Sequence, residues 1–437
     1  MRDYHGWNDY FPHFCKFFYR LYYFVRATGY RAVSDYVART YGVYPKVFYV
    51  EHHEAHAWSV YGTSGQKSPL LVTADGVGDD ISLTVNTSRG GLIRRVFFQY
   101  YPHSFGQFYT ALTQYLGFTG GRHEGKITGL AAYGAADPEL VSRIESTLRP
   151  SEGFKLDKRY YSEGFVRNIR LAALFGSGRG VFGLFRQGFG TSDAAFDYRT
   201  YKRPLAKILD GYSREDLANA YQHLTERELV RIVSDHNRAG GIDLGVAGGV
   251  MANVKLNQAL SRVTGVHSFY AFPNMGDGGL CVGAALAVQG KPARRIDHVY
   301  LGESAVEDQI LEALADSPAE LSWHQPENAA KEAAKNIVAG RVVARFAGRM
   351  EFGPRALGNR SILYHGADPS VNDWLNDRLQ RSEFMPFAPI FPIEDAPEYF
   401  DVRDGELHAC QFMMLVVNAT ERMKRDCPAA VHVDGTC

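Results

Sequence analysis

The sequence predicts an α/β protein in which buried strands lead through glycine turns into helices. Two segments have this order, "IDLGVAGGVMANVKLNQAL" at 242–260 and "HSFYAFPNMGDGGLCVGAALAV" at 267–288. In each, a short apolar run with β-branched or aromatic residues precedes a pair of glycines and a longer run that favours a helix. The chain has 437 residues, of which 45% are hydrophobic, so it can bury the cores of two domains or more.

The first element is the apolar run 47–50, "VFYV", which we expect to be a buried strand. Three histidines follow it among residues that favour a helix. His52 and His56 are four residues apart, which places both rings on one helix face, as a pair of metal ligands requires. The zinc-protease motif H-E-x-x-H does not fit, because the order His-Glu-Ala-His at 53–56 is one residue too short. The alternative is a set of junction histidines that bind backbone carbonyl groups.

The middle of the chain predicts a hairpin followed by helices. Alternating apolar residues and the Gly90-Gly91 pair indicate two antiparallel strands within 70–100. Residues 105–134 are expected to form helices divided by "GFTGGRHEGK", and 149–212 to form an irregular insertion. The Ser-x-x-Asp sequence at 213–216 caps a long amphipathic helix.

Three glycine turns bring backbone amides to places where a phosphate or ribose can approach. Together they resemble the nucleotide site of the actin and sugar-kinase fold. Their residues are Asp75, Gly76, Gly78 and Asp79, then Gly248 and Gly249, then Gly276, Asp277, Gly278 and Gly279.

Beyond the polar stretch "QGKPARRID" at 289–297, the sequence predicts a second unit. Residues 304–307 are expected to cap and begin a helix. Arg349, Arg355 and Arg360 then lie in a glycine-containing loop, where guanidinium groups and flexible backbone suit a small phosphate ligand. The alternative is a set of surface salt bridges, for example from Arg349 to Glu351 or Glu383.

Charge and cysteine content limit the classes of function. Lys plus Arg equals Asp plus Glu, 48 each, so no basic field favours nucleic acid, and a small-molecule substrate is expected. The aromatic run 14–25 is broken by Lys16 and Arg20, so no membrane span is expected. The widely spaced cysteines contain no C-x-x-C pair, which predicts reduced thiols and a cytoplasmic location. They are Cys15, Cys281, Cys410, Cys427 and Cys437.

Seven motifs together resemble the O-carbamoyltransferases of nodulation and antibiotic biosynthesis. They are "EHHEAHA", "ADGVGD", "EGKITGLAAYG", "AGGVMANVKLN", "PNMGDGGLCVGAAL", "RMEFGPRALGNRSIL" and "SEFMPFAP", in the order of that family. The resemblance implies an actin/sugar-kinase-like (ASKHA) domain related to Kae1 at 1–296, and an incomplete YrdC-like α/β domain at 297–437.

The resemblance also implies roles for individual residues. A divalent metal, Fe²⁺ with Mg²⁺ or Mn²⁺ as alternatives, is expected on His52, His56, Asp277 and Asp75, with His53 beside it. ATP is expected on Asp75, Gly76, Lys126, Gly248, Gly249, Asn253, Gly276 and Gly278. Carbamoyl phosphate is expected on Arg355 and Arg360, with Asn359 or Ser361 donating to the carbamoyl end and Arg349 as a further candidate.

The implied reaction is ATP-dependent O-carbamoyl transfer. Carbamoyl phosphate and ATP give carbamoyl-adenylate, and the carbamoyl group passes to a hydroxyl of a sugar, an aminoglycoside or a macrolactam alcohol. We expect no nucleic-acid or membrane partner, and a homodimer as the candidate assembly. The alternatives are threonylcarbamoyl transfer to tRNA and an inactive nucleotide-binding scaffold.

Two departures from the family's pattern affect stability. The family's first hairpin has no counterpart before residue 47, and the chain ends at "HVDGTC", where relatives continue. We therefore expect an incomplete chain in which the strand at 70–76 has an unpaired edge and "FMMLVVNA" at 412–419 lacks partners. Poor solubility and little turnover would follow.

Overall fold

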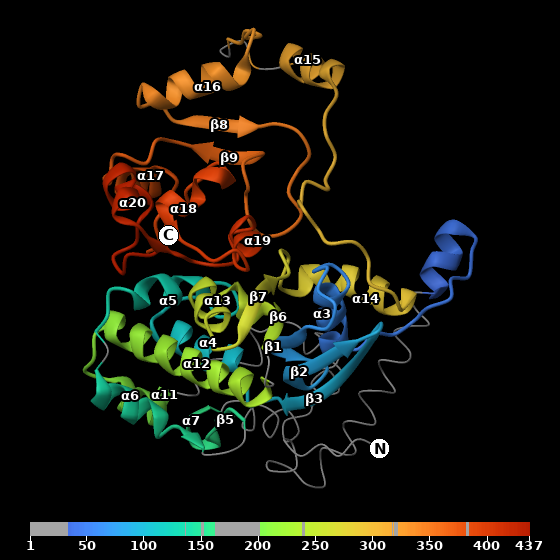
Figure 1. Cartoon of the computed structure of the whole chain (residues 1–437), viewed down its shortest axis with the longest axis vertical. Helices are drawn as coiled ribbons and strands as arrows, with labels where there is room; N and C mark the ends of the chain where they lie inside the picture. The colour runs from blue at the N-terminus through green and yellow to red at the C-terminus, as the bar shows by residue number, and fades with distance from the viewer. Residues whose placement is uncertain are drawn as a thin grey trace, which may run out of the picture.

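The computed structural model describes residues 34–135, 137–149, 153–161, 202–237, 241–316, 318, 322–381 and 384–437. The aromatic run 14–25 and residues 162–201 of the expected insertion lie outside this description. Figure 1 shows two regions, an N-terminal region up to residue 296 built on one sheet, and a C-terminal region from 297 above it. No helix in the described part is long and apolar enough to cross a membrane.

A five-stranded mixed sheet forms the centre of the N-terminal region. Its strands lie in the order β3-β2-β1-β6-β7, antiparallel from β3 to β1 and parallel from β1 to β7. The bounds are β1 (Leu70–Gly78), β2 (Ile81–Arg89), β3 (Leu92–Tyr100), β6 (Ile242–Ala247) and β7 (Val266–Ala271). The predicted α/β class and the antiparallel strands within 70–100 are confirmed.

Helices cover both faces of the sheet, because side chains alternate along β1. Leu71 packs with α3 (His52–Tyr61) and α14 (Leu280–Gln289), whereas Leu70 and Val72 belong to the larger core on the other face. Several helices contribute to that core, among them the four that cover most of this face of the sheet. They are α4 (Phe105–Tyr115), α5 (Glu124–Ala131), α12 (Arg214–His236) and α13 (Val254–Ser261).

Two expectations about strands are wrong. Residues 47–50 form no strand, and Phe48 is 53% exposed, because β propensity alone does not provide a neighbouring strand. The strand that begins at Leu70 has no open edge, since β2 and β6 pair with its two sides.

The described part of the predicted insertion is regular rather than irregular. It contains the small sheet of β4 (Leu148–Arg149) and β5 (Lys155–Leu156), then α7 (Lys158–Tyr161) and α11 (Lys202–Leu209), next to α6 (Pro138–Glu145). Phe154 and Leu156 are buried in the main core. Because these two side chains are buried, residues 153–161 pack against the main core.

The C-terminal region carries a two-stranded sheet, β8 (Val343–Phe346) and β9 (Arg360–Leu363), beside helices. Helix α15 (Glu307–Ala315) begins where expected, but its cap is Val306 rather than Ser304, because the Gln309 side chain accepts from the Val306 amide. The other elements are α16 (Ala329–Val338), α17 (Val371–Arg378), α18 (Ala396–Tyr399), β10 (Phe400–Asp401), α19 (Leu407–Cys410), β11 (Asn418–Ala419) and α20 (Glu421–Asp426).

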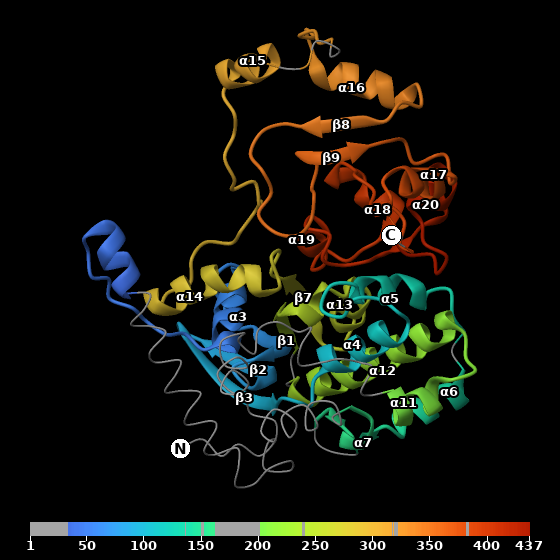
Figure 2. The same cartoon turned by 180° about the vertical axis from the view of Figure 1, so that it is seen from behind.

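The last forty residues pack on the N-terminal region, as Figures 1 and 2 show for α19 and the C-terminus beside α13 and α5. Met414 and Leu415 belong to the same core cluster as β1 and α12. The Asn257 amide donates to the Met414 carbonyl at 2.7 Å, and the Gly129 carbonyl lies 3.0 Å from His432 Nε2. The stretch 412–419 is therefore buried rather than short of partners, which removes the physical reason for expecting an unstable chain.

This shared core predicts that the two regions unfold together. Leu415→Ala should lower the free energy of unfolding by about 2–5 kcal/mol, because it opens a cavity at a side chain that is 6% exposed. The matched control Leu92→Ala removes a leucine that is 76% exposed, and should change stability by less than about 0.5 kcal/mol. Urea denaturation followed by circular dichroism checks both, and a separate early transition in Leu415→Ala would contradict the shared core.

Candidate metal centre

Two carboxylates bind backbone amides in the first turn of α3, one from the residue before the helix and one from the turn after β1. Glu51 caps the helix by accepting from the amides of His53 and Glu54, and Arg95 of β3 binds the same carboxylate at 2.5 Å. The His52 amide donates to Asp79 Oδ2 at 2.9 Å from the turn between β1 and β2. These contacts fix the start of the helix, and with it the direction of the histidine side chains.

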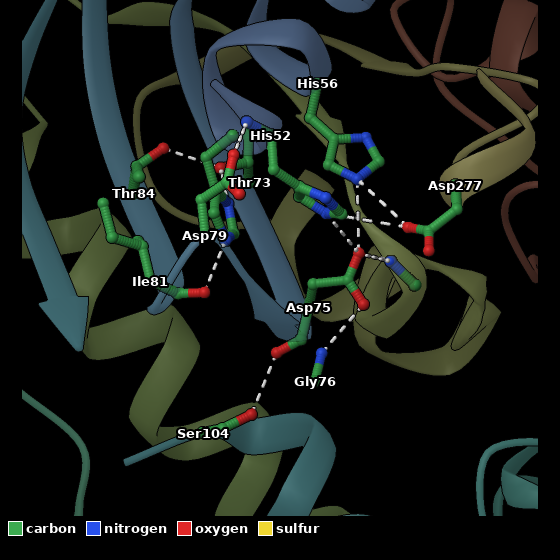
Figure 3. A network of polar contacts seen from close by, with 12 residues as sticks. His52, His56, Thr73, Asp75, Gly76, Asp79, Ile81, Thr84, Ser104 and Asp277 are labelled. Atoms are coloured by element: carbon green, nitrogen blue, oxygen red, sulfur yellow. Dashed lines mark hydrogen bonds and ion pairs between the residues drawn. The ribbon is translucent and has the colours of Figure 1, made fainter. Parts of the chain in front are cut away.

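Four side chains meet above the end of β1 (Figure 3). His52 Nε2 lies 3.5 Å from Asp75 Oδ2 and 3.6 Å from Asp277 Oδ1. His56 Nε2 lies 3.2 Å and 3.9 Å from the same two oxygens. All four donor atoms lie within 4.8 Å of one another, so the structure brings together the residues expected to bind a metal.

The carboxylates set the electrostatics of this cluster. Although burial alone would lower the pKa of His52, the carboxylates of Asp75, Asp277 and Asp79 raise it above its ordinary value. Burial alone would raise the pKa of Asp75, but the neighbouring His52 and His56 rings and the Gly249 amide hold it far below its usual range. Negative charge therefore dominates between the two imidazoles, as a cation site requires.

The donors fit a divalent transition metal. His52 Nε2 is buried without a hydrogen-bond partner, although it points into the cluster. Metal–ligand bonds of about 2.1 Å place neighbouring donors of a tetrahedral site about 3.4 Å apart, close to the observed spacings of 3.2–3.9 Å. Two imidazoles with two carboxylates suit Fe²⁺, Mn²⁺ or Zn²⁺ better than an all-oxygen metal such as Mg²⁺.

His53 lies on the other side of the helix start and has a structural role. Its Nε2 donates to the Ile81 carbonyl at 2.9 Å, so its Nδ1, 2.7 Å from Thr73 Oγ1, is the acceptor. Thr73 also contacts Thr84 of β2. Burial, with a smaller contribution from His52, lowers the pKa of His53 to about 3, so the ring stays neutral and ties α3 to β1 and β2.

Close backbone approaches connect the cluster to the glycine turns. A Cβ atom on Gly78 would lie 2.1 Å from His52 Cδ2, so only glycine allows the turn to pack on this ring. The Gly249 amide donates to Asp75 Oδ2 at 3.0 Å, and the Gly76 amide donates to Asp75 Oδ1 at 2.8 Å. Asp75 therefore joins two of the three predicted turns.

The other residues expected to bind nucleotide lie in the glycine turns and on helices α13 and α5. Gly248 leads into the 3₁₀ turn at 249–252, and Gly276 and Gly278 flank Asp277. Asn253 caps α13 and bonds Gln222, so its side chain is already used. Lys126 is buried on α5, with its Nζ 5.7 Å from the Phe118 ring.

In the C-terminal region, most of the predicted anion ligands are occupied by protein groups. Arg360 donates to the carbonyl groups of residues 347, 348 and 359 and stacks on Phe346 at 3.6 Å. Asn359 donates to the Arg349 carbonyl, Ser361 Oγ accepts from the Gly358 amide, and Arg349 binds the carbonyl groups of residues 301 and 302.

Arg355 differs from these residues. Its Nη2 lies 3.4 Å from the Ala252 carbonyl of the N-terminal region, and its Nε is buried without a hydrogen-bond partner. The hydrogen-bond partners of Arg355 and Arg360 differ among the described residues, and their expected common role in binding carbamoyl phosphate remains a prediction.

Sequence reasoning missed the residues that hold the site in place. They are Glu51, Ser104, which donates to the Asp75 carbonyl at 2.9 Å, and Glu351, whose carboxylate accepts three backbone amides. Ser104 precedes an amphipathic segment and caps α4, so the helix-start pattern could have identified it. Glutamate is not a favoured cap, which explains why Glu51 gave no signal.

Comparison with known proteins places this geometry in a family. The family description "Carbamoyltransferase N-terminus" matches residues 17–286, and "Carbamoyltransferase C-terminus" matches residues 334–437. Nodulation protein NolNO of Sinorhizobium fredii is 30% identical over 90% of this chain, and Nodulation protein NolO of Bradyrhizobium diazoefficiens is 31% identical over 89%. Nodulation protein U of Sinorhizobium fredii is 28% identical over 91%. The alignments cover 54%, 66% and 66% of these relatives, respectively.

Removing one imidazole should abolish metal binding. We expect His56→Ala to lose binding of Mn²⁺ or Fe²⁺ measured by calorimetry under anaerobic conditions, because two carboxylates and one imidazole leave the site a ligand short. His298→Ala removes an exposed histidine and should bind metal as the wild type does. Equal metal binding by His56→Ala and wild type would refute the site.

The neutral state of His53 predicts a pH dependence of stability. Between pH 6.5 and about 3 the unfolded chain binds a proton at residue 53 and the folded chain does not, so stability falls as the pH falls. This one group contributes up to about 1.36 kcal/mol per pH unit. Denaturation of His53→Gln and wild type without metal should show their difference in stability shrinking towards acid pH. A difference that stays constant with pH would contradict the neutral ring.

Proposed function

This chain belongs to the carbamoyltransferase family, and on that premise we propose that it transfers a carbamoyl group to a hydroxyl of a small molecule with ATP. The family membership supports carbamoyl transfer as the general reaction. The donor, the activated intermediate and the acceptor are our proposals, and they concern a chain that covers about 54–66% of the relatives named above.

The proposed donor is carbamoyl phosphate, activated by ATP. Water first hydrolyses carbamoyl phosphate to carbamate and inorganic phosphate. A carbamate oxygen then attacks the α-phosphorus of ATP, pyrophosphate leaves, and carbamoyl-adenylate forms. The acceptor's hydroxyl oxygen then attacks the carbamoyl carbon, the hydroxyl proton is lost, and AMP leaves. Both steps concentrate negative charge on phosphate oxygens, so a site that performs them needs cationic groups arranged before the reaction.

The metal centre supports a role in holding the nucleotide phosphate. A divalent ion on His52, His56, Asp75 and Asp277 would supply positive charge to phosphate oxygens. Asp277 is the ligand best placed to share an ion with a substrate, because its side chain is 75% exposed, whereas His56 is fully buried. The glycines on both sides of Asp277 leave backbone rather than side chains around this open position.

The arrangement of the two regions supports transfer inside one molecule. The loop between β8 and β9 brings Arg355 to the carbonyl of Ala252, three residues after the amide that binds Asp75. Groups on both regions can therefore act on one bound intermediate, which limits its loss to water and fixes the reactants in position. Cytoplasmic action, where ATP and reduced cysteines are available, is part of the same proposal.

A small-molecule acceptor is favoured over tRNA. The chain has equal numbers of acidic and basic residues, so it lacks the excess of positive charge that phosphate backbones select. The observation that carries the proposal is the convergence of His52, His56, Asp75 and Asp277 beside a glycine turn.

The test is the formation of AMP that requires carbamoyl phosphate. With ATP, metal and a hydroxyl acceptor such as an aminoglycoside or a sugar, the wild type should release AMP only when carbamoyl phosphate is added. Asp277→Asn should slow this release by roughly 100-fold or more. The substitution weakens binding of the metal that would stabilise the negative charge developing on the phosphate oxygens. Asp308→Asn on the exposed start of α15 should not change the rate.

Two results would contradict the proposed function. One is AMP release that proceeds equally without carbamoyl phosphate. The other is tight tRNA binding in a filter assay at low salt, which would favour transfer to a nucleic acid.

A further inference from the structure

One buried carboxylate organises the loop between β8 and β9. Glu351 is 8% exposed, and its Oε1 accepts the amides of Leu357, Asn359 and Arg360 at 2.8, 2.9 and 3.2 Å. Burial alone would raise the pKa of Glu351, but these amides lower it below its ordinary value. A charged acceptor binds amides more strongly than a neutral one, so the loop is closed at its base and residues 352–356 project from it.

The base of this loop is also fixed to the connection between the regions. The Phe352 amide donates to the Val299 carbonyl at 2.7 Å, and Arg349 Nε donates to the Gly302 carbonyl at 2.7 Å. The direction in which the loop projects is therefore set by hydrogen bonds on both sides of Glu351, one from a side chain and one from the backbone.

The tip of the loop reaches the N-terminal region between two glycine turns. A Cβ atom on Gly353 would lie 3.2 Å from the Pro273 carbonyl, and Arg355 Nη2 lies 3.4 Å from the Ala252 carbonyl. Pro273 stands four residues before Asp277, and Ala252 ends the short turn that starts at Gly249. One turn carries Asp277 and the other carries the Gly249 amide that binds Asp75, so Arg355 reaches the N-terminal region at segments that build the metal centre.

The guanidinium group of Arg355 has unused binding capacity at this position. Its Nε is buried without a hydrogen-bond partner, and burial lowers its pKa. None of the ion pairs found among the described residues involves Arg355, in contrast to Arg262, which pairs with Asp401, and Arg403, which pairs with Glu406. A guanidinium nitrogen shielded from water without a partner is costly, and an anion bound beside it removes that cost.

We propose that Glu351 is a positioning residue that holds Arg355 across the boundary, where the guanidinium binds the phosphate of an adenosine nucleotide on the N-terminal region. This inference rests on the proposed function. The sequence predicted that Arg355 binds carbamoyl phosphate. The present inference assigns Arg355 to the nucleotide instead. Glu351 acts only through the loop and does not touch the ligand.

The experiment compares two ligands that differ by one phosphate, AMP and adenosine, by calorimetry on the metal-loaded full chain. Arg355→Ala should weaken AMP binding about 10- to 100-fold and leave adenosine binding unchanged, because only the phosphate is contacted. Arg355→Lys should lose less, since lysine keeps the charge but not the fork. The control Arg341→Ala removes an exposed arginine and should bind both ligands as the wild type does.

The role of Glu351 is tested in the same assay. Glu351→Ala should weaken AMP binding and spare adenosine, and Glu351→Gln should restore part of the loss because its amide oxygen still accepts. In the Arg355→Ala background, Glu351→Ala should have little further effect, since it acts through Arg355.

Several outcomes would overturn the inference. Unchanged AMP binding in Arg355→Ala would refute it while leaving the proposed nucleotide site intact, and so would loss of carbamoyl-phosphate binding alone. Equal losses for AMP and adenosine would show a structural effect rather than a phosphate contact. Failure of the wild type to bind either ligand would refute the inference together with the proposed function.

Discussion

The carboxylate of Asp75 is the contact on which the site depends. It extends from the end of β1, and its Oδ2 faces His52, His56 and the Gly249 amide at the same time. Its backbone carbonyl is held by Ser104 at the start of α4. One side chain therefore joins the central strand, the helix with the histidines, and the turn after β6. A site built on a paired central strand can keep its geometry while loops around it differ.

The order of the strands explains why residues distant in the sequence meet. Strands β1, β6 and β7 are parallel neighbours, so their carboxyl ends lie at one edge of the sheet. Asp75 lies in the carboxyl-terminal half of β1, and the segments after β6 and β7 carry Gly249 and Asp277. Helix α3 packs on α14 and presents the histidines to the same edge. The position agrees with the general tendency of open α/β sheets to place ligands beyond the carboxyl ends of strands.

The features that the sequence predicted are those with a local signal. The spacing of His52 and His56, the glycine turns, and the apolar runs of β1, β6 and β7 each depend on a few adjacent residues. Two predictions were wrong, the strand at 47–50 and the open edge of β1. Both concern which strands are neighbours in the sheet, and no local sequence pattern contains that information. The burial of 412–419 likewise required the N-terminal region as a surface to pack on. The roles of Glu51 and Glu351 were invisible because a buried carboxylate that caps backbone amides has no characteristic spacing.

The central claim is that a divalent metal at this edge of the sheet holds the phosphate of a nucleotide. The most direct measurement is a crystal structure of the full chain with Mn²⁺ and AMP, with anomalous diffraction collected to locate the metal. We expect one strong anomalous peak about 2.0–2.2 Å from the Nε2 atoms of His52 and His56, with a phosphate oxygen of AMP among the ligands of the metal. A peak elsewhere, or AMP bound with its phosphate directed away from this cluster, would contradict the central claim.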